Sequence, residues 1–386
     1  MFHVFVVNDT TFKYHLEYLF AGTCALENPG FLKEKEYQNF QKKKDGLTAR
    51  QELSICGMIA DVSRIREGDK ILFYLTQTSE HEGMFFGAFA VKDKAFFDSN
   101  ADNYLASYLN VNLNFRVQIV PDKVYAYGVS EREALDSLAE ISHPSQMCWS
   151  LIYRKLKGKR GCTMITDYEA KRLCNLIEAK NNGVSLEGSY FTYDAEKKLV
   201  KSSSEENSYT GNKESIDIKD RMIVKEKRKK AYEAHLQAYI LQHIDEEPLC
   251  SLLDLKNDED LWIGNEVSCG VGMQSIDIMT QQSSNNTCLI NIIELKCVEP
   301  YDSILSYQLP KYIDWVMDYI IPLQRDFRIK IQPIIIAKKF EKEEQLADYI
   351  QRCNSWQYKH LNSVTISKVK YIGYEINDDI SFERLN

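Results

Sequence analysis

The sequence lacks several features that would place it in a special class of protein. Its 386 residues contain no run of about 18 apolar residues, so no membrane-spanning helix is predicted. The apolar segment Met1–Val7 is short, with no basic lead and no small-residue cleavage site, and is expected to be a strand rather than a signal peptide. The ten cysteines form no Cys-x-x-Cys pair and no Cys/His cluster with zinc spacing. We therefore expect a cytoplasmic protein with free thiols and no membrane partner.

The sequence also lacks an excess of basic residues, because its net charge is -8. This balance argues against a uniformly basic nucleic-acid binder, although phosphates can be bound by local patches. Two basic runs stand out, at residues 154–160 and 225–230. Each run is equally compatible with a phosphate-binding patch and with a solvated surface. Hydrophobic residues make up 44% and charged residues 27%, which is ordinary for a globular protein.

The length predicts two or three domains. Residues 1–180 are rich in predicted strands and aromatic residues without a βαβ rhythm, which favours an α+β or barrel-like domain. Residues 181–221 lose this periodicity and are predicted to be a flexible linker, within which 189–193 is a candidate short strand. In residues 222–386, the order helix, three strands, helix, strand, helix, strand predicts a three-layer α/β sandwich. The expected fold class is thus α+β with two domains.

The hydrophobic pattern also gives approximate bounds for the individual elements. In the first domain we predict strands at Phe2–Val7, Lys70–Leu75, Met84–Val91 and Phe115–Ile119. We predict helices there at Ala49–Ser63, Glu131–Glu140 and Thr166–Lys180. In the second domain we predict helices at Val224–His243, Ser303–Ile320 and Glu344–Cys353, and strands at Leu261–Glu266, Gln274–Met279, Leu289–Cys297, Ile334–Ala337 and Lys368–Ile376.

Two predicted strands of the second domain carry charges into an apolar setting. Asp277 interrupts one strand, and Glu294 and Lys296 interrupt the next. Because side chains alternate along a strand, Glu294 and Lys296 point to the same face. The polar stretch Gln281–Thr287 is expected to be a loop between antiparallel neighbours, which would bring the three charges together. Two carboxylates and an ammonium at one place are the groups of a metal-dependent phosphodiesterase.

The second domain resembles the PD-(D/E)XK nuclease superfamily, in particular its RecB-like branch and the NucS-type endonucleases. The resemblance rests on motifs in the family's order along the chain, namely Glu233 on a first helix, Asp277, the tripeptide Glu294-Leu295-Lys296, and Gln308 with Tyr312 in Gln-x-x-x-Tyr. Pro310 interrupts this last motif and fits only if the helix begins near it. The resemblance implies a restriction-endonuclease-like fold with a central mixed sheet.

The chemistry of the motif residues points to a magnesium site. Mg²⁺ binds hard oxygen ligands, and Asp277 and Glu294 would supply carboxylates while the carbonyl of Leu295 could add a third ligand. We expect Mn²⁺ to substitute. Lys296 would orient or deprotonate the attacking water, or stabilise the charge that develops on the phosphorus.

The remaining motif residues have supporting roles. Glu233 is expected behind the metal site or as part of it. Gln308 and Tyr312 are one turn apart and share a helix face. The resemblance implies that this face contacts the active site or the DNA backbone.

The first domain has a weaker resemblance to the EVE/YTH/PUA-like fold, a β-barrel with helices. It is carried by residues 65–75, 85–91, 114–117 and 149–155. Proteins of this class hold a flipped or unpaired modified base in an aromatic pocket. The resemblance implies that the base-binding candidates are Trp149, Phe73, Tyr74 and Phe86. It implies that the phosphate-binding candidates are Arg154, Lys155 and Arg160. Strand alternation lets only some of these rings face a pocket, and the others would pack in the core.

Together these features predict a Mg²⁺-dependent DNA endonuclease that reads a modified base with one domain and cuts with the other, as in modification-dependent restriction. Cutting both strands requires two centres, so a homodimer is expected. One alternative is a NucS-like nuclease for mismatched or branched DNA. Another is a non-catalytic nucleic-acid-binding protein, although two facing carboxylates without a cation would repel each other. RNA stays open as a substrate.

Overall fold

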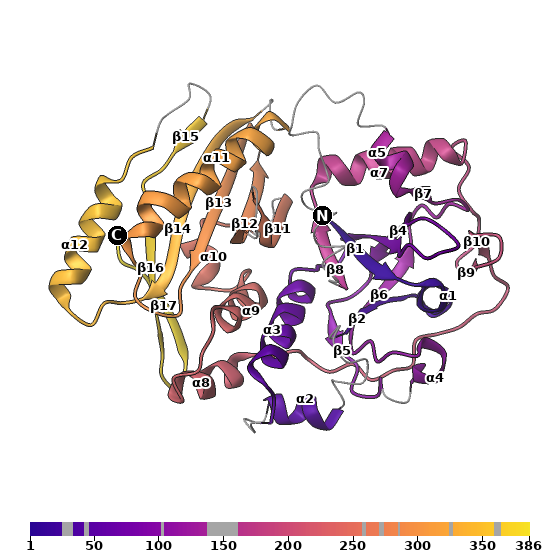
Figure 1. Ribbon diagram of the computed structural model, residues 1–386, viewed down its shortest axis with the longest axis horizontal. Coiled ribbons are helices and arrows are strands. Elements are labelled where there is room, and N and C mark those ends of the chain that lie inside the picture. The colour runs from indigo at the N-terminus through magenta and orange to yellow at the C-terminus, as the bar shows by residue number, and fades with distance from the viewer. Residues whose placement is uncertain are drawn as a thin grey trace. The chain divides into compact units, whose positions relative to one another are not determined.

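The computed structural model describes residues 1–24, 34–41, 46–101, 104–136, 161–256, 260–269, 274–284, 286–323, 327–358 and 364–386 (Figure 1). It divides into two compact units, Met1–Ile216 and Asp217–Asn386. Among the described residues, no helix combines the length and the apolar character needed to cross a membrane.

The first unit is a mixed α+β unit built on one sheet. Its main strands follow the order β2-β6-β4-β3-β1-β8, in which β1 and β3 are parallel and the other neighbours are antiparallel. Within the described part of the chain the two ends of this order, β2 and β8, do not pair, so the sheet is a half-barrel. The strands are β1 (Phe2–Val7), β2 (Phe20–Thr23), β3 (Lys70–Leu75), β4 (Met84–Val91), β5 (Phe96–Phe97), β6 (Phe115–Pro121), β7 (Val129–Ser130) and β8 (Cys162–Ile165).

Several helices of this unit begin at polar capping residues. The Thr48 hydroxyl caps α3 by accepting a hydrogen bond from the Gln51 backbone amide, and the Gln51 side-chain oxygen accepts one from the Thr48 backbone amide. Asn8 and Thr11 form the same reciprocal arrangement at α1. The helices are α1 (Asp9–Glu17), α2 (Glu34–Gln41), α3 (Ala49–Ser63), α4 (Ala106–Leu109), α5 (Glu131–Asp136) and α7 (Asp167–Lys180). The predicted bounds of β1, β3, β4 and α3 are confirmed.

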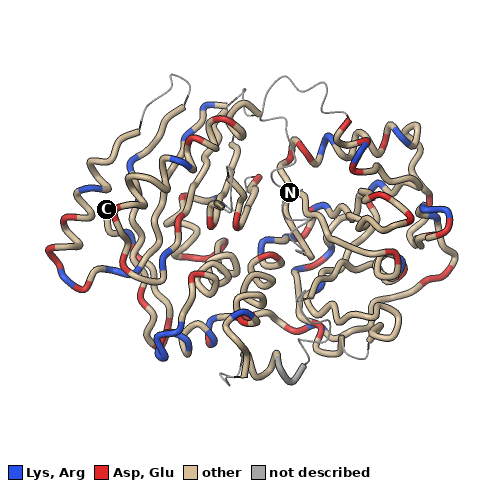
Figure 2. The backbone as a smooth tube through the Cα atoms, viewed as in Figure 1, with Lys and Arg blue, Asp and Glu red and all other residues tan. Residues whose placement is uncertain are grey.

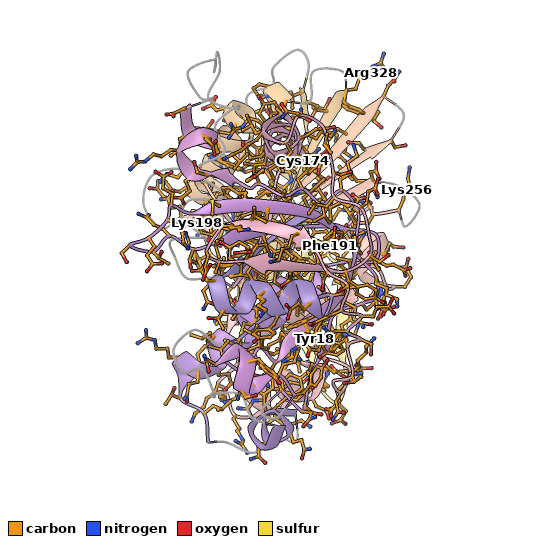
Figure 3. All side chains as sticks on the ribbon, turned by 90° about the vertical axis from the view of Figure 1, so that its right-hand side faces the viewer. Tyr18, Cys174, Phe191, Lys198, Lys256 and Arg328 are labelled. Carbon is orange, nitrogen blue, oxygen red and sulfur yellow. The ribbon has the colours of Figure 1, made fainter. Side chains whose placement is uncertain are left out.

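The segment predicted to be a flexible linker belongs mostly to the first unit. Strands β9 (Phe191–Asp194) and β10 (Leu199–Ser202) form a hairpin, with Phe191 and Lys198 labelled in Figure 3. The hairpin packs on α1, where the rings of Tyr193 and Phe12 lie 5.0 Å apart. The linker prediction is therefore corrected, because strands of four residues are too short to show a clear period.

The second unit contains a mixed sheet, as predicted. Its order is β11-β12-β13-β14-β16-β17, with β11 to β13 antiparallel and β14 parallel to both β13 and β16. Helices α9 and α11 pack on β13, and α12 packs on β16. The strands are β11 (Asp260–Ser268), β12 (Ser275–Ser284), β13 (Thr287–Leu295), β14 (Arg328–Lys338), β15 (Val364–Ile366), β16 (Lys370–Ile376) and β17 (Ile380–Arg384). The helices are α8 (Lys219–Lys227), α9 (Glu233–His243), α10 (Leu249–Leu252), α11 (Leu309–Tyr319) and α12 (Glu343–Ser355).

Two predicted elements of this unit differ in the structure. The helix expected over Val224–His243 is interrupted between α8 and α9, where Lys229 adopts a positive φ of 54°. The basic run explains the break, since cations are favoured at a helix C-terminus and like charges one turn apart destabilise a continuous helix. The polar loop expected at 281–287 is mostly strand, because Gln282 buries its amide in hydrogen bonds to the backbone of Lys256.

The start of α11 agrees with the condition set by Pro310. A π-helical turn, Ile304–Gln308, leads into α11, and Pro310 lies in the first turn of that helix. A proline is tolerated there because the first amides of a helix have no intrahelical acceptor.

Candidate functional site

Strands β12 and β13 bring Asp277 and Glu294 together. The register pairs Ile278 with Ile293, and the two carboxylates stand one residue beyond that pair. The backbone amide of Leu295 donates a 2.7 Å hydrogen bond to Asp277 Oδ2. Both carboxyl groups thus face the same place at the end of the hairpin, as the alternation pattern predicts.

Lys296 follows β13 directly and occupies the space between two carboxylates. Its Nζ lies 2.7 Å from Glu294 Oε1 and 3.3 Å from Glu233 Oε1, and it donates a 2.8 Å bond to the Leu295 carbonyl. Three acceptors match the three donors of an ammonium. Burial lowers the pKa of Lys296, but the charges of Glu294 and Glu233 outweigh burial and raise it. These neighbours therefore favour the protonated, charged form of Lys296.

The two buried carboxyl groups hold their protons more tightly than usual. Burial and the neighbouring charge of Glu294 raise the pKa of Asp277. Burial also raises the pKa of Glu294, although Lys296 and the nearby Tyr312 hydroxyl act in the opposite direction. A second positive charge at this position would relieve the repulsion between the two carboxylates.

Tyr312, on α11, lies beside Glu294, whereas Gln308 is the last residue of the π-helical turn that leads into α11. Burial, followed by the charge of Glu294, raises the pKa of Tyr312, so this hydroxyl stays protonated and can donate. Among the described residues, Gln308 Oε1 and Glu294 Oε2 are buried without a hydrogen-bond partner. Such orphaned oxygens are rare in folded proteins and suit a bound cation or ordered water.

The donor set fits a hard divalent cation. The described residues contain no group of three His, Cys, Asp or Glu side chains arranged to hold a metal. Mg²⁺ needs only one or two carboxylates, since water and substrate phosphate complete its coordination. Asp277 and Glu294 provide those carboxylates. The Leu295 carbonyl already accepts from Lys296, and its second lone pair is the further ligand position.

One residue of this site escaped the sequence reasoning. Gln237 on α9 is buried, and its amide donates a 2.8 Å hydrogen bond to the backbone carbonyl of Asp277. It stands one turn after Glu233 and therefore on the same helix face. The four-residue spacing between Glu233 and Gln237 is the sequence pattern that could have identified Gln237 as a site residue.

A cavity adjoins the site next to Cys297, the residue after Lys296. It has a volume of about 820 Å³ and is lined in part by Val298, Lys338 and Tyr374. Lys338 is paired with Glu226 at the end of α8. Figure 2 shows the basic residues that gather at α8, and Lys227 among them pairs with Asp378 at 3.0 Å. Part of the basic run 225–230 is therefore paired with acidic residues of its own unit.

The three predicted base-binding residues that the structure describes are buried in the first unit. Trp149, Arg154, Lys155 and Arg160 lie outside the described residues. Phe73 and Phe86 are fully buried with their rings 5.4 and 5.1 Å from that of Phe12. Tyr74 is buried too, and its hydroxyl donates a 2.6 Å bond to Glu131. These three assignments are corrected, because a ring that stacks on a base needs an accessible face.

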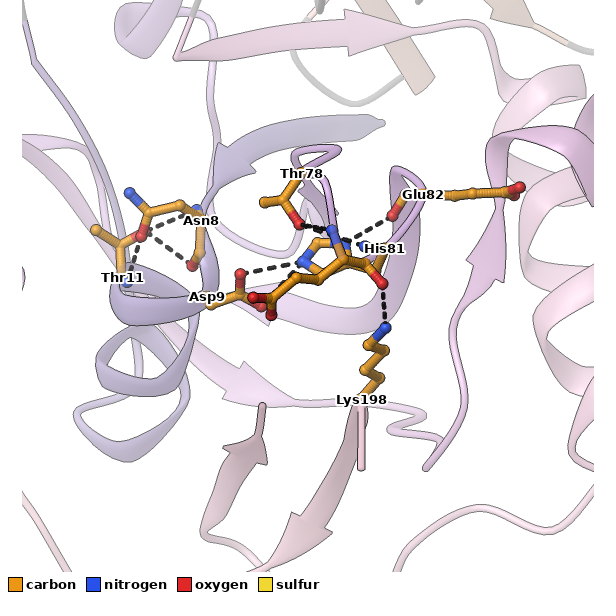
Figure 4. A network of polar contacts seen from close by, with 8 residues as sticks. Asn8, Asp9, Thr11, Thr78, His81, Glu82 and Lys198 are labelled. Carbon is orange, nitrogen blue, oxygen red and sulfur yellow. Dashed lines mark hydrogen bonds and ion pairs between the residues drawn. The ribbon is translucent and has the colours of Figure 1, made fainter. Parts of the chain in front are cut away.

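A polar network instead lies at the carboxyl ends of the parallel strands β1 and β3 (Figure 4). His81 Nε2 lies 3.0 Å from Asp9 Oδ2, and His81 Nδ1 lies 2.8 Å from the carbonyl of Glu82. Burial lowers the pKa of His81, but the hydrogen bond to Asp9 raises it, and the net shift is upward. Lys198, at the turn of the β9–β10 hairpin, donates to the carbonyl of Glu80. The network fixes the loop after β3 to α1.

Comparison with known proteins gives distant structural likenesses. No family model matches the sequence, and no curated protein matches it. A protein from Pseudomonas putida is similar at 13% identity, over 46% of this chain and 99% of its own, with a TM-score of 0.26. A hypothetical protein from Leishmania major has 16% identity, over 47% of this chain and 97% of its own, with a TM-score of 0.25.

A human structure is similar at the same level. Human THYN1 protein, solved in complex with DNA containing 5-methylcytosine, has 9% identity over 46% of this chain and 97% of its own, with a TM-score of 0.26. At these identities and TM-scores, the structural similarity does not indicate the function of this chain.

Proposed function

We propose that the second unit is a Mg²⁺-dependent phosphodiester hydrolase that cuts DNA, of the restriction-endonuclease-like kind. The observation that supports this proposal most strongly is the pairing of Asp277 and Glu294 on adjacent strands, with Lys296 bonded to one of them. Glu294 Oε2, buried and without a partner among the described residues, is the oxygen that a cation would satisfy.

The charge of the site requires a cation if its substrate is a phosphate ester. Asp277, Glu294 and Glu233 surround a single ammonium, that of Lys296. When all are ionised the site is net negative and repels a phosphodiester. Mg²⁺, or Mn²⁺ in its place, would neutralise this charge, act as a Lewis acid and lower the pKa of bound water.

The protein side chains have distinct roles in this mechanism. Asp277 and Glu294 hold the cation. Lys296, kept charged by its carboxylate neighbours, stabilises the negative charge that develops on the phosphorus in the transition state. Glu233 and Tyr312 position Lys296 and Glu294, and Gln237 fixes the backbone of Asp277.

We further infer that the first unit reads a modified base in DNA, so that the whole protein acts in modification-dependent restriction as a homodimer. 5-Methylcytosine is the first base to test, since the human THYN1 structure holds DNA containing it. A nuclease for mismatched or branched DNA is the second candidate, because the site in the second unit suits either substrate.

Cleavage assays separate these functions. Unmodified, 5-methylcytosine-containing and 5-hydroxymethylcytosine-containing plasmids, together with mismatched and branched duplexes, are incubated with the full chain in Mg²⁺, Mn²⁺ or EDTA. We expect metal-dependent cutting that favours one modified plasmid. Equal cutting of all plasmids would overturn the restriction function, and preference for mismatched or branched duplexes would establish repair. DNA binding without cleavage of any substrate would indicate a non-catalytic DNA-binding protein.

A further inference from the structure

We infer that Tyr301 is a base-stacking residue beside Lys296 and that it selects DNA with an unpaired nucleotide next to the scissile phosphate. This inference rests on the proposed nuclease function and names its substrate class. It comes from an aromatic side chain that the proposed mechanism does not use.

Large apolar side chains are exposed just after the candidate site. Val298, Tyr301 and Tyr307 are exposed by 54%, 46% and 55%. Exposed apolar groups that gather in one place mark binding surfaces in soluble proteins. The segment that carries them runs from the end of β13 to the start of α11, so it connects the elements that supply Glu294 and Tyr312.

Of these three residues, Tyr301 has its ring next to Lys296 of the candidate site. Its ring centroid lies 5.9 Å from Lys296 Nζ, which itself lies 2.7 Å from Glu294. The backbone at Tyr301 is anchored, because its carbonyl accepts a 3.1 Å hydrogen bond from the Ile304 amide. Pro300 precedes it and restricts the backbone further. The ring thus lies beside the lysine that would face a phosphate.

Tyr307 is equally exposed but differs in its surroundings. Lys311 Nζ lies 3.8 Å from the Tyr307 ring centroid and donates to its hydroxyl. Lys311 therefore lies closer to the Tyr307 ring than Lys296 lies to the Tyr301 ring, where the distance is 5.9 Å. The residue type, the unit and the exposure match those of Tyr301, which makes Tyr307 a suitable internal control.

The ligand that fits an exposed ring beside a phosphate-binding cation is a nucleobase. Stacking of a base on an aromatic side chain contributes about 1–3 kcal/mol and does not depend on sequence. In a duplex both faces of each base are covered by neighbours in the stack. Only an unpaired base, in a single strand, a flap or a flipped-out position, has a free face for Tyr301.

The test measures binding separately from cleavage. Fluorescein-labelled single-stranded DNA and its duplex are titrated with the full chain in EDTA, and stacking is followed with 2-aminopurine in the single strand. We expect Tyr301→Ala to weaken single-strand binding about 5- to 150-fold and to leave duplex binding unchanged. The variant should also restore the 2-aminopurine fluorescence that stacking on Tyr301 quenches in the wild type. Tyr301→Phe should keep wild-type affinity, and Tyr307→Ala should change it less than Tyr301→Ala does.

The outcomes also distinguish this inference from the proposed function. Equal single-strand binding by Tyr301→Ala and wild type, or equal losses on both DNAs, would overturn the stacking role. A shift in mass by light scattering with Tyr301→Ala would assign the ring to a contact between copies of the chain and overturn it too. Metal-dependent cleavage that survives Asp277→Asn would instead refute the nuclease centre while Tyr301-dependent binding stands.

Discussion

Lys296 joins a buried carboxylate to an accessible one. Its Nζ lies 2.7 Å from Glu294, whose side chain is 2% exposed, and 3.3 Å from Glu233, whose side chain is 42% exposed. The ammonium is thereby fixed at the boundary between the protein interior and the solvent, where a phosphate could reach it. This geometry makes Lys296 the partner of Glu294 and, under the proposed function, would make it the cation that faces the substrate.

Replacing Lys296 tests the first of these roles. Lys296→Met leaves the buried Glu294 without its counter-charge, so we expect a loss of about 3–5 kcal/mol in the free energy of unfolding of the second unit. Urea unfolding followed by tryptophan fluorescence measures it. Lys339→Met is the matched control, because Lys339 pairs with Glu375 and Glu383, which are both more than half exposed. A change of about 0–1 kcal/mol is expected there, and equal losses in the two variants would contradict the buried pair.

Replacing Asp277 should have opposite effects with and without metal. In EDTA, Asp277→Asn removes a carboxyl group whose ionised form is disfavoured by burial and by Glu294, and we expect a higher melting temperature than that of the wild type. With Mg²⁺ at about 100 times its Kd, the wild type should gain about 2.7 kcal/mol and the variant should gain little. Differential scanning fluorimetry measures both. A variant that is less stable in EDTA, or that responds to Mg²⁺ as the wild type does, would speak against a cation held by this pair.

The His81–Asp9 contact predicts a pH dependence in the first unit. The pKa of His81 is raised above its unfolded value of about 6.5. A raised histidine pKa stabilises the folded state fully below about pH 6.5, and this contribution is lost as pH rises through the folded value. Amide exchange in residues 76–83, compared between wild type and His81→Gln at each pH, should differ at pH 6 and converge as the pH rises. A difference that does not depend on pH would contradict this assignment.

The polar cluster around Arg116 predicts that residues after 200 stabilise the first unit. Arg116 and Asp98 form a fully buried ion pair at 2.8 Å, and the Tyr209 hydroxyl contacts both. Tyr209→Phe should lower the free energy of unfolding by about 1–3 kcal/mol, because it leaves buried polar groups with one partner fewer. Chemical denaturation measures it, with Tyr190→Phe as the control hydroxyl. No effect of Tyr209→Phe would favour a loosely attached segment.

The candidate site was largely predictable because strand alternation fixes side-chain direction. Glu294 and Lys296 share a face by sequence spacing alone, and an antiparallel neighbour then places Asp277 beside them. The link from Lys296 to Glu233 was not predictable in its geometry. It depends on where α9 packs on β13, which no local pattern encodes.

Other features depend on tertiary contacts that the sequence does not display. The hydrophobic pattern cannot tell a ring that lines a pocket from a ring in the core, so Phe73 and Phe86 were misassigned. The segment containing Tyr209 looks polar and aperiodic, yet one hydroxyl ties it to a buried ion pair. In both cases the decisive partner lies far away in the sequence.

Cleavage by the wild type and by variants of the two carboxylates tests the central claim most directly. Asp277→Asn and Glu294→Gln keep the shape of the site and remove the ligands of the cation, and Glu375→Gln is a carboxylate control in the same unit. We predict that Mg²⁺-dependent DNA cleavage is abolished in the first two and unchanged in the control, with DNA binding retained throughout. Cleavage at the wild-type rate by either Asp277→Asn or Glu294→Gln would contradict the proposed active site.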